Sequence, residues 1–157
     1  ESIGIRQADL LDGSKPCIVN TGNSFLVVAL RSSDIVRSVK PALEKIAAIS
    51  EQHDLIGYYL FSPQTSKKGR DASARMFAPR YGIDEEAATG MAAGPLACFL
   101  YDKLRMTKIS FAIEQGYLMA EPSPSVILVR LNVKEGVLSG LMAGGKATIS
   151  EIRKIDL

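Results

Sequence analysis

The sequence predicts an α+β fold in which a curved, mostly antiparallel sheet wraps around one central apolar helix. Residues 90–104 are apolar on nearly every side, and a helix without a polar stripe is buried rather than laid on a surface. From residue 107 onward the pattern predicts short strands joined by tight turns, which favours antiparallel pairing. With 157 residues, 46% of them hydrophobic, the chain is long enough for one domain with its own core.

The N-terminal half supplies strands and two short helices. Residues 16–20 and 24–30 are β-branched and apolar, and the intervening residues include Gly22, which suits a positive φ. Ser32 can cap a short helical turn, and Pro41 is expected to open a helix over 41–52. A strand over 56–62 and a polar surface loop over 64–71 follow.

The C-terminal half holds the central helix and the remaining strands. Pro79 ends a strand over 74–79. Pro95 lies inside the predicted helix, where proline costs up to about 3 kcal/mol, so we expect the helix to start late or to bend there. Glycine- and proline-containing breaks then separate four more predicted strands, which cover residues 110–114, 126–133, 137–141 and 146–152.

Composition excludes several classes of partner and site. The chain has 19 basic and 17 acidic side chains, so nothing in its charge indicates nucleic acid or an anionic membrane. No stretch approaches the roughly 20 apolar residues that span a bilayer. With one histidine and no CxxC, we expect no metal site. Cys17 and Cys98 lie in apolar stretches, which is typical of buried thiols and of a cytoplasmic protein.

The predicted start of the central helix is a candidate ligand site. The first N–H groups of a helix lack partners within it and carry partial positive charge. Thr89-Gly90-Met91-Ala92 can therefore form a cradle for a carboxylate, with the glycine allowing close approach. The alternative is structural: Thr89 caps the helix, and Gly90 and Gly94 permit close packing.

Other polar residues also have two interpretations. Glu85 and Glu86 can include a general acid or base, or they can be solvated charges that complement the helix dipole. Arg75 can bind a carboxylate through two hydrogen bonds, or it can be an exposed or ion-paired residue. Asn20 can contact a ligand, although asparagine before Thr-Gly more often stabilises a turn.

The segment from Arg75 to Leu96 carries a family resemblance. It is similar to a hallmark of the PhzF-type phenazine-biosynthesis-like isomerases, R-x-F-x-P-x-x-G-I-x-E-D-P-A-T-G-S-A-A-G-P-L. Asn20-Thr21-Gly22 and Glu114-Gln115-Gly116 add to it. The resemblance covers nearly the whole chain but only the second half of the family. It implies that residues 1–157 form one domain like the C-terminal domain of a diaminopimelate epimerase-like fold, without the N-terminal domain that carries the family's acid/base glutamate.

The resemblance also implies an activity and a set of site residues. The family members are isomerases that act on small carboxylated metabolites by proton transfer, without metal, flavin or pyridoxal cofactor, in a cleft between two domains. Glu86 matches an aspartate that assists catalysis or positions the substrate. Substrate binding is implied for Thr89, Gly90, Met91 and Ala92, with Asn20 as a distant addition.

Three departures from the family pattern favour a second interpretation. Ala87 replaces a proline, Met91 replaces a serine (a cysteine in the epimerases), and Glu121 stands where arginine is usual. A thioether carries no proton, so a cysteine-pair mechanism is excluded at residue 91. The alternative is a non-catalytic binding or oligomerisation module. A domain that lacks its sister domain should expose an apolar face, which predicts a homodimer.

Overall fold

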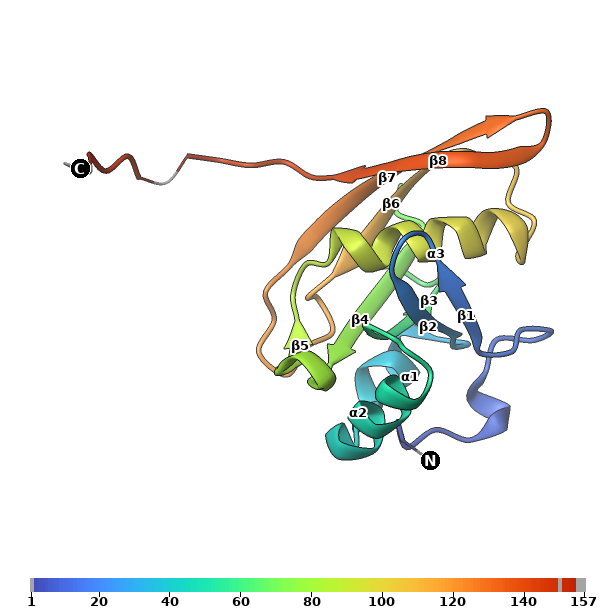
Figure 1. Ribbon diagram of the computed structural model, residues 1–157, viewed down its shortest axis with the longest axis vertical. Helices are drawn as coiled ribbons and strands as arrows, with labels where there is room; N and C mark the ends of the chain where they lie inside the picture. The colour runs from blue at the N-terminus through green and yellow to red at the C-terminus, as the bar shows by residue number, and fades with distance from the viewer. Residues whose placement is uncertain (1, 150, 155–157) are drawn as a thin grey trace.

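A single sheet curls around one helix in the computed structural model, which describes residues 2–149 and 151–154 (Figure 1). The strands lie in the order β1-β2-β3-β4-β6-β7-β8, and β5 pairs with β4 beside this path. Their bounds are β1 Cys17–Asn20, β2 Ser24–Ala29, β3 Gly57–Ser62, β4 Ala72–Ala78, β5 Ile83–Glu86, β6 Ser110–Gln115, β7 Ser125–Lys134 and β8 Val137–Gly144.

The helices lie on both faces of this sheet. The α-helices are α1 Ser33–Ser38, α2 Leu43–Gln52 and α3 Gly90–Asp102, with 3-10 turns η1 at Gln7–Asp9 and η2 at Pro79–Tyr81. The concave face surrounds α3, and the opposite face of β2 and β3 packs against α1 and α2. None of the helices in the described part of the chain is long and apolar enough to cross a membrane.

Strand pairing follows from the connections between strands. The β2–β3 and β4–β6 pairs are parallel, since α1 with α2 and β5 with α3 carry the chain back between them. The remaining pairs, including the β6-β7-β8 series, are antiparallel. The predicted α+β fold with a mostly antiparallel, curled sheet around an apolar helix is confirmed.

The central helix is buried because its packing residues are small or apolar on all sides. Ala92, Ala93, Leu96 and Ala97 are inaccessible to solvent. A Cβ placed on Gly94 would lie 3.0 Å from a methyl carbon of Leu141, so glycine lets β8 lie close against the helix.

Proline does not delay the central helix. Pro95 is the sixth residue of α3, which begins at Gly90, so the late start considered above is wrong. The missing N–H of Pro95 removes only the hydrogen bond to the carbonyl of Met91, one turn from the helix start.

Three other boundaries differ from the prediction. Helix α2 begins at Leu43 rather than residue 41. Strand β5 was not predicted, because acidic residues are poor strand formers and its pairing with β4 is a tertiary contact. The strand expected over 146–152 is absent at residues 146–149, 151 and 152, and Ser150 lies outside the described residues. Over residues 145–149 and 151–154 the chain belongs to no strand and extends away from the sheet (Figure 1).

Candidate active site at the start of the central helix

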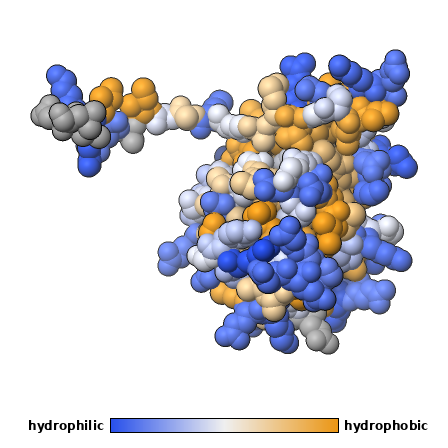
Figure 2. Space-filling model, viewed as in Figure 1, coloured by the Kyte–Doolittle hydropathy of each residue, from blue (hydrophilic) through white to orange (hydrophobic). Residues whose placement is uncertain are grey.

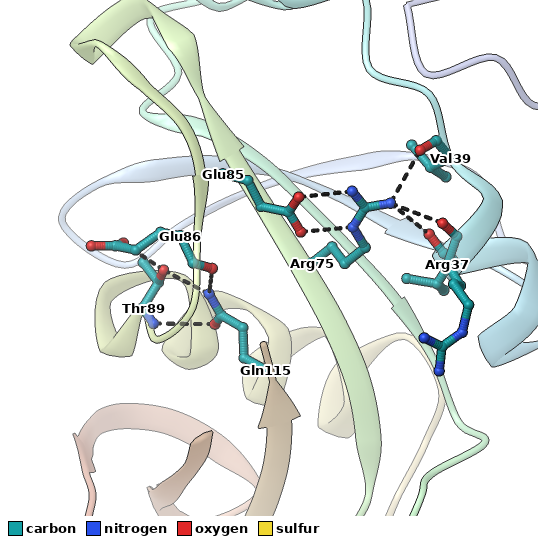
Figure 3. Close-up of polar contacts among 8 residues, drawn as sticks. Arg37, Val39, Arg75, Glu85, Glu86, Thr89 and Gln115 are labelled. Atoms are coloured by element: carbon teal, nitrogen blue, oxygen red, sulfur yellow. Dashed lines mark hydrogen bonds and ion pairs between the residues drawn. The ribbon is translucent and has the colours of Figure 1, made fainter. Parts of the chain in front are cut away.

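Two adjacent glutamates on β5 point to opposite sides of the strand (Figure 3). This follows from the two-residue period of a β-strand, which sends successive side chains to opposite faces. Strand β5 is held beside β4 by the pairing of Glu86 with Met76. Glu85 therefore faces Arg75, while Glu86 faces the start of α3.

Arg75 forms a structural anchor rather than a free ligand site. Its Nε and Nη2 donate to the two carboxylate oxygens of Glu85, both at 2.7 Å. Its Nη1 donates to the carbonyls of Val36, Arg37 and Val39 at 3.1–3.2 Å, at the end of α1. Because Arg75 is only 6% exposed, the ion-paired interpretation describes it, and β4 and β5 are thereby tied to α1.

Glu86 belongs to a buried hydrogen-bond network. Its Oε2 accepts a hydrogen bond of 2.7 Å from the hydroxyl of Thr89. That hydroxyl accepts a bond of 2.9 Å from Nε2 of Gln115, which also donates to the backbone carbonyl of Glu86 at 2.6 Å. The Oε1 of Gln115 accepts from the Thr89 N–H at 3.1 Å and from the Tyr59 hydroxyl at 2.8 Å. Hydrogen bonds to Gln115 of β6, which in turn is bonded to Tyr59 of β3, thus hold the turn between β5 and α3.

Burial keeps the end of this network opposite Glu86, which is Tyr59, un-ionised. Tyr59 and Gln115 are inaccessible to solvent. Desolvation raises the pKa of the Tyr59 hydroxyl far above its ordinary value of about 10. Tyr59 is therefore a permanent hydrogen-bond donor to Gln115 at physiological pH, and neither residue can itself exchange protons with a ligand.

The start of α3 is not capped by its threonine side chain. The Thr89 hydroxyl makes no capping bond, because it is committed to Glu86. The N–H groups of Ala92 and Ala93 both donate to the Thr89 carbonyl. Within the described residues, the N–H groups of Gly90 and Met91 have no such acceptor. The Met91 side chain is 53% exposed.

A cavity of about 630 Å³ opens beside this helix start. Gly90 and Ser125 line it, together with two basic residues, Arg70 from the loop before β4 and Lys146 from beyond β8. Among the residues that the structure describes, neither cation forms an ion pair. The Nε of Arg70 is buried and lacks a hydrogen-bond partner there. The cavity therefore joins a helix N-terminus with two positive charges.

Asn20 lies apart from this group. Its side-chain oxygen accepts from the Gly22 N–H at 2.8 Å and its amide donates to Ser24 at 2.8 Å, which is turn chemistry. It lines a second cavity, of about 620 Å³, between β1, β8 and the C-terminal part of α3. Cys17 and Cys98 line the same cavity, and burial, with the nearby Asp102 carboxylate, raises the pKa of the Cys98 thiol.

The structure adds residues that the sequence analysis passed over. Arg70 lies in the predicted polar surface loop, Lys146 opens a predicted strand, and Gln115 appeared only in a segment that carries the family resemblance. A basic residue shows its role only when the cavity it faces is known. The one local signal for Gln115 is a glutamine between an apolar predicted strand and a glycine. The structure shows that this amide is buried, where an amide requires hydrogen-bond partners.

Comparison with known proteins identifies the family. The family model of phenazine biosynthesis-like proteins matches residues 3–151. The chain belongs to this family. An uncharacterised isomerase of Clostridium acetobutylicum is 30% identical over 140 residues, which cover 87% of this chain and 46% of the relative. The trans-2,3-dihydro-3-hydroxyanthranilate isomerase of Pseudomonas aeruginosa is 38% identical over 84 residues, covering 50% of this chain and 30% of that protein.

Solved structures share the fold. A phenazine biosynthesis protein of Bacillus anthracis, of the PhzF family, matches 92% of this chain and 50% of its own with a TM-score of 0.71 at 22% identity. A predicted epimerase of Pseudomonas aeruginosa matches 96% of this chain and 50% of its own with a TM-score of 0.64 at 21% identity. The chain thus spans about half the length of the relatives it matches.

Proposed function

We propose that this chain is one half of a PhzF-like isomerase, and that it binds a small carboxylated metabolite at the start of α3 for cofactor-independent proton transfer. The observation that carries the proposal is the placement of Glu86. Its carboxylate is fixed by the Thr89 hydroxyl at 2.7 Å within the segment that resembles the family hallmark. Membership of a family with isomerase-named relatives supports the reaction class.

The ligand class follows from the charges around the cavity at the start of α3, which Ala88 and Gly90 line. Arg70 and Lys146 line it as well. Oriented N–H groups and cations both favour an anion. The name of the Pseudomonas aeruginosa relative, a hydroxyanthranilate isomerase, points to a carboxylated ring. Within a volume of about 630 Å³ a single-ring carboxylate fits readily.

Glu86 is proposed as the carboxylate that exchanges a proton with the bound metabolite or orients it. A second acid or base is needed for a complete proton shuttle, since a proton removed from one carbon must be delivered to another. We propose that the family's N-terminal domain supplies it, from the same or another polypeptide. The whole protein's substrate, and its location in the cytoplasm, are parts of this proposal.

Titration with small carboxylates tests the binding step. Backbone amide NMR of the chain is followed on addition of anthranilate, benzoate and succinate, with benzamide as the uncharged analogue. We expect shifts at the amides of residues 88–91 and 125–127 with the carboxylates and none with benzamide. Shifts elsewhere only, or no shifts at millimolar ligand, would contradict the proposed site.

Charge removal sharpens this test. Arg70→Gln should weaken carboxylate binding about fivefold, because one partly exposed charge-assisted hydrogen bond contributes about 1 kcal/mol. Arg37→Gln is the matched control, since Arg37 is an exposed arginine on α1 that does not line the cavity. Equal affinities of the two variants would remove Arg70 from the site.

A second candidate function is an oligomerisation module, which the exposed edge of the sheet favours. Among the residues that the structure describes, strand β8 is the last in the sheet and pairs with a strand on one side only, and it contains no charged residue. Val137 and Met142 on this strand are 67% and 61% exposed. Apolar side chains gather over the β7–β8 hairpin in the space-filling view (Figure 2). An uncharged edge strand of this kind pairs readily with another chain.

Sedimentation velocity distinguishes this candidate. We expect a homodimer at micromolar concentration, which Met142→Lys dissociates because a charge on the edge strand disfavours pairing. Lys45→Glu, a charge change on the exposed side of α2, should leave the dimer intact. If the wild-type chain stays monomeric throughout the micromolar range, it is not a self-associating module.

A further inference from the structure

The hydrogen-bond network beneath Glu86 has a fixed direction, which two backbone groups determine. The Thr89 N–H can only donate, and it lies 3.1 Å from Oε1 of Gln115. The backbone carbonyl of Glu86 can only accept, and it lies 2.6 Å from Nε2 of Gln115. Exchanging the oxygen and nitrogen of Gln115 would set two donors against each other and two acceptors against each other. The amide therefore has one possible orientation.

This orientation determines where the hydroxyl proton of Thr89 points. The second N–H of Gln115 occupies a lone pair of the Thr89 hydroxyl at 2.9 Å. The hydroxyl must then use its own proton elsewhere, and the partner in reach is Oε2 of Glu86, at 2.7 Å. Oε2 is consequently an acceptor whether Glu86 is ionised or not.

From this geometry we infer that Glu86 carries its exchangeable proton on Oε1, and that Gln115, acting through Thr89, is the positioning residue that selects this oxygen. A proton on Oε2 would point at a hydroxyl that already accepts from Gln115, and it would leave the hydroxyl proton of Thr89 without a partner. Thr89 is 7% exposed, so water cannot readily satisfy that proton. Oε1 makes no hydrogen bond to any described residue.

This assignment deepens the proposed function, because it rests on Glu86 being the acid–base group of the site. It names the reacting atom. A metabolite bound beside α3 must present its acidic C–H, or the carbon that receives the proton, to Oε1. The Thr89 hydroxyl stays bound to Oε2 in both protonation states, so the carboxyl group need not rotate between the two halves of a proton transfer.

The variant Glu86→Gln reports the direction without any ligand. A glutamine side chain at residue 86 must place its oxygen against the Thr89 hydroxyl and its NH₂ at the position of Oε1. In a ¹⁵N-labelled sample with labelled threonine methyls, we expect no NOE from this NH₂ group to the Thr89 methyl. A strong NOE would mean that the hydroxyl accepts from residue 86, and it would overturn the inference.

Two further variants test the role of Gln115. In Glu86→Gln combined with Gln115→Glu, the donor to the Thr89 hydroxyl is lost, the hydroxyl can turn toward the new carboxylate at position 115, and the NOE should appear. Its continued absence would overturn the role of Gln115. In Glu86→Gln combined with Tyr59→Phe, the two backbone groups still orient Gln115, so the NOE should stay absent. Its appearance there would contradict backbone control of the direction.

The outcomes separate this inference from the proposed function. If the variant that carries Gln115→Glu does not fold, the Glu86→Gln and Tyr59→Phe measurements still decide the direction of the network. If the NOE results are as expected but the chain binds no carboxylate, the proposed function is refuted and the direction of the hydrogen-bond network is supported. If the chain binds carboxylates but the Glu86→Gln single variant shows the NOE, the proposed function is supported and the assignment of the proton to Oε1 is refuted.

Discussion

Replacement of Arg75 by leucine should destabilise the fold strongly. The side chain makes five hydrogen bonds, two to Glu85 and three to the carbonyls of Val36, Arg37 and Val39. Removing one partner of a buried ion pair costs about 3–5 kcal/mol, because the other charge stays behind without compensation. We expect a loss of about 4 kcal/mol from a total of about 5–15 kcal/mol.

Urea unfolding followed by circular dichroism measures this loss. With a slope of about 2 kcal/mol per molar urea, the midpoint of Arg75→Leu should fall by about 2 M at nearly constant slope. Adding Glu85→Leu should restore about 1–2 kcal/mol, since it removes the carboxylate left without a partner. Arg6→Leu is the matched control, because Arg6 forms an ion pair with Asp9 while 84% exposed, and its midpoint should not change.

A small effect would refute this reasoning. If Arg75→Leu loses less than about 1 kcal/mol, the five hydrogen bonds contribute no more than an exposed ion pair. Arg75 would then be free to serve a ligand, which is the interpretation that the geometry disfavours. Arg75→Lys adds a further check, since lysine keeps the charge but cannot bridge Glu85 and the α1 carbonyls together, and it should remain well below the wild type.

Two further predictions concern single positions in the sheet. Gly57→Ala should lower the free energy of unfolding by about 1–3 kcal/mol, because its Cβ would lie 2.2 Å from the Phe77 carbonyl oxygen. Gly140→Ala is the control: its nearest contact is 3.6 Å, and its free energy of unfolding should stay within about 0.5 kcal/mol of the wild type in the same urea experiment. Equal midpoints would show that the β3–β4 pair can shift. The second prediction concerns Tyr59, whose pKa burial raises in the folded state, so that above about pH 10 only the unfolded chain loses the hydroxyl proton. The stability advantage of the wild type over Tyr59→Phe should therefore fall by up to about 1.4 kcal/mol per pH unit above that pH. If the difference in unfolding free energy between the wild type and Tyr59→Phe is the same at neutral pH and about one pH unit above the ordinary tyrosine pKa, Tyr59 is not buried in its un-ionised form.

The sequence by itself determined the fold class and the place of the candidate site. Residues 90–104 lack a polar stripe and must be buried, and the antiparallel strands after residue 107 follow from the short turns between them. The segment from Arg75 to Leu96 carried the family resemblance, and the match to residues 3–151 confirms the family. These features are predictable because periodicity, turn chemistry and residue spacing are local properties of the chain.

Only the tertiary structure decided what the polar residues do. Glu85 and Glu86 are neighbours with the same chemistry, yet one completes an ion pair with Arg75 and the other faces the start of α3. The division depends on which face of β5 each side chain occupies and on what lies opposite that face, which is Arg75 of β4 for Glu85 and Thr89 for Glu86. The roles of Gln115 and Arg70 likewise depend on partners 26 or more residues away or across a cavity, which no local pattern encodes.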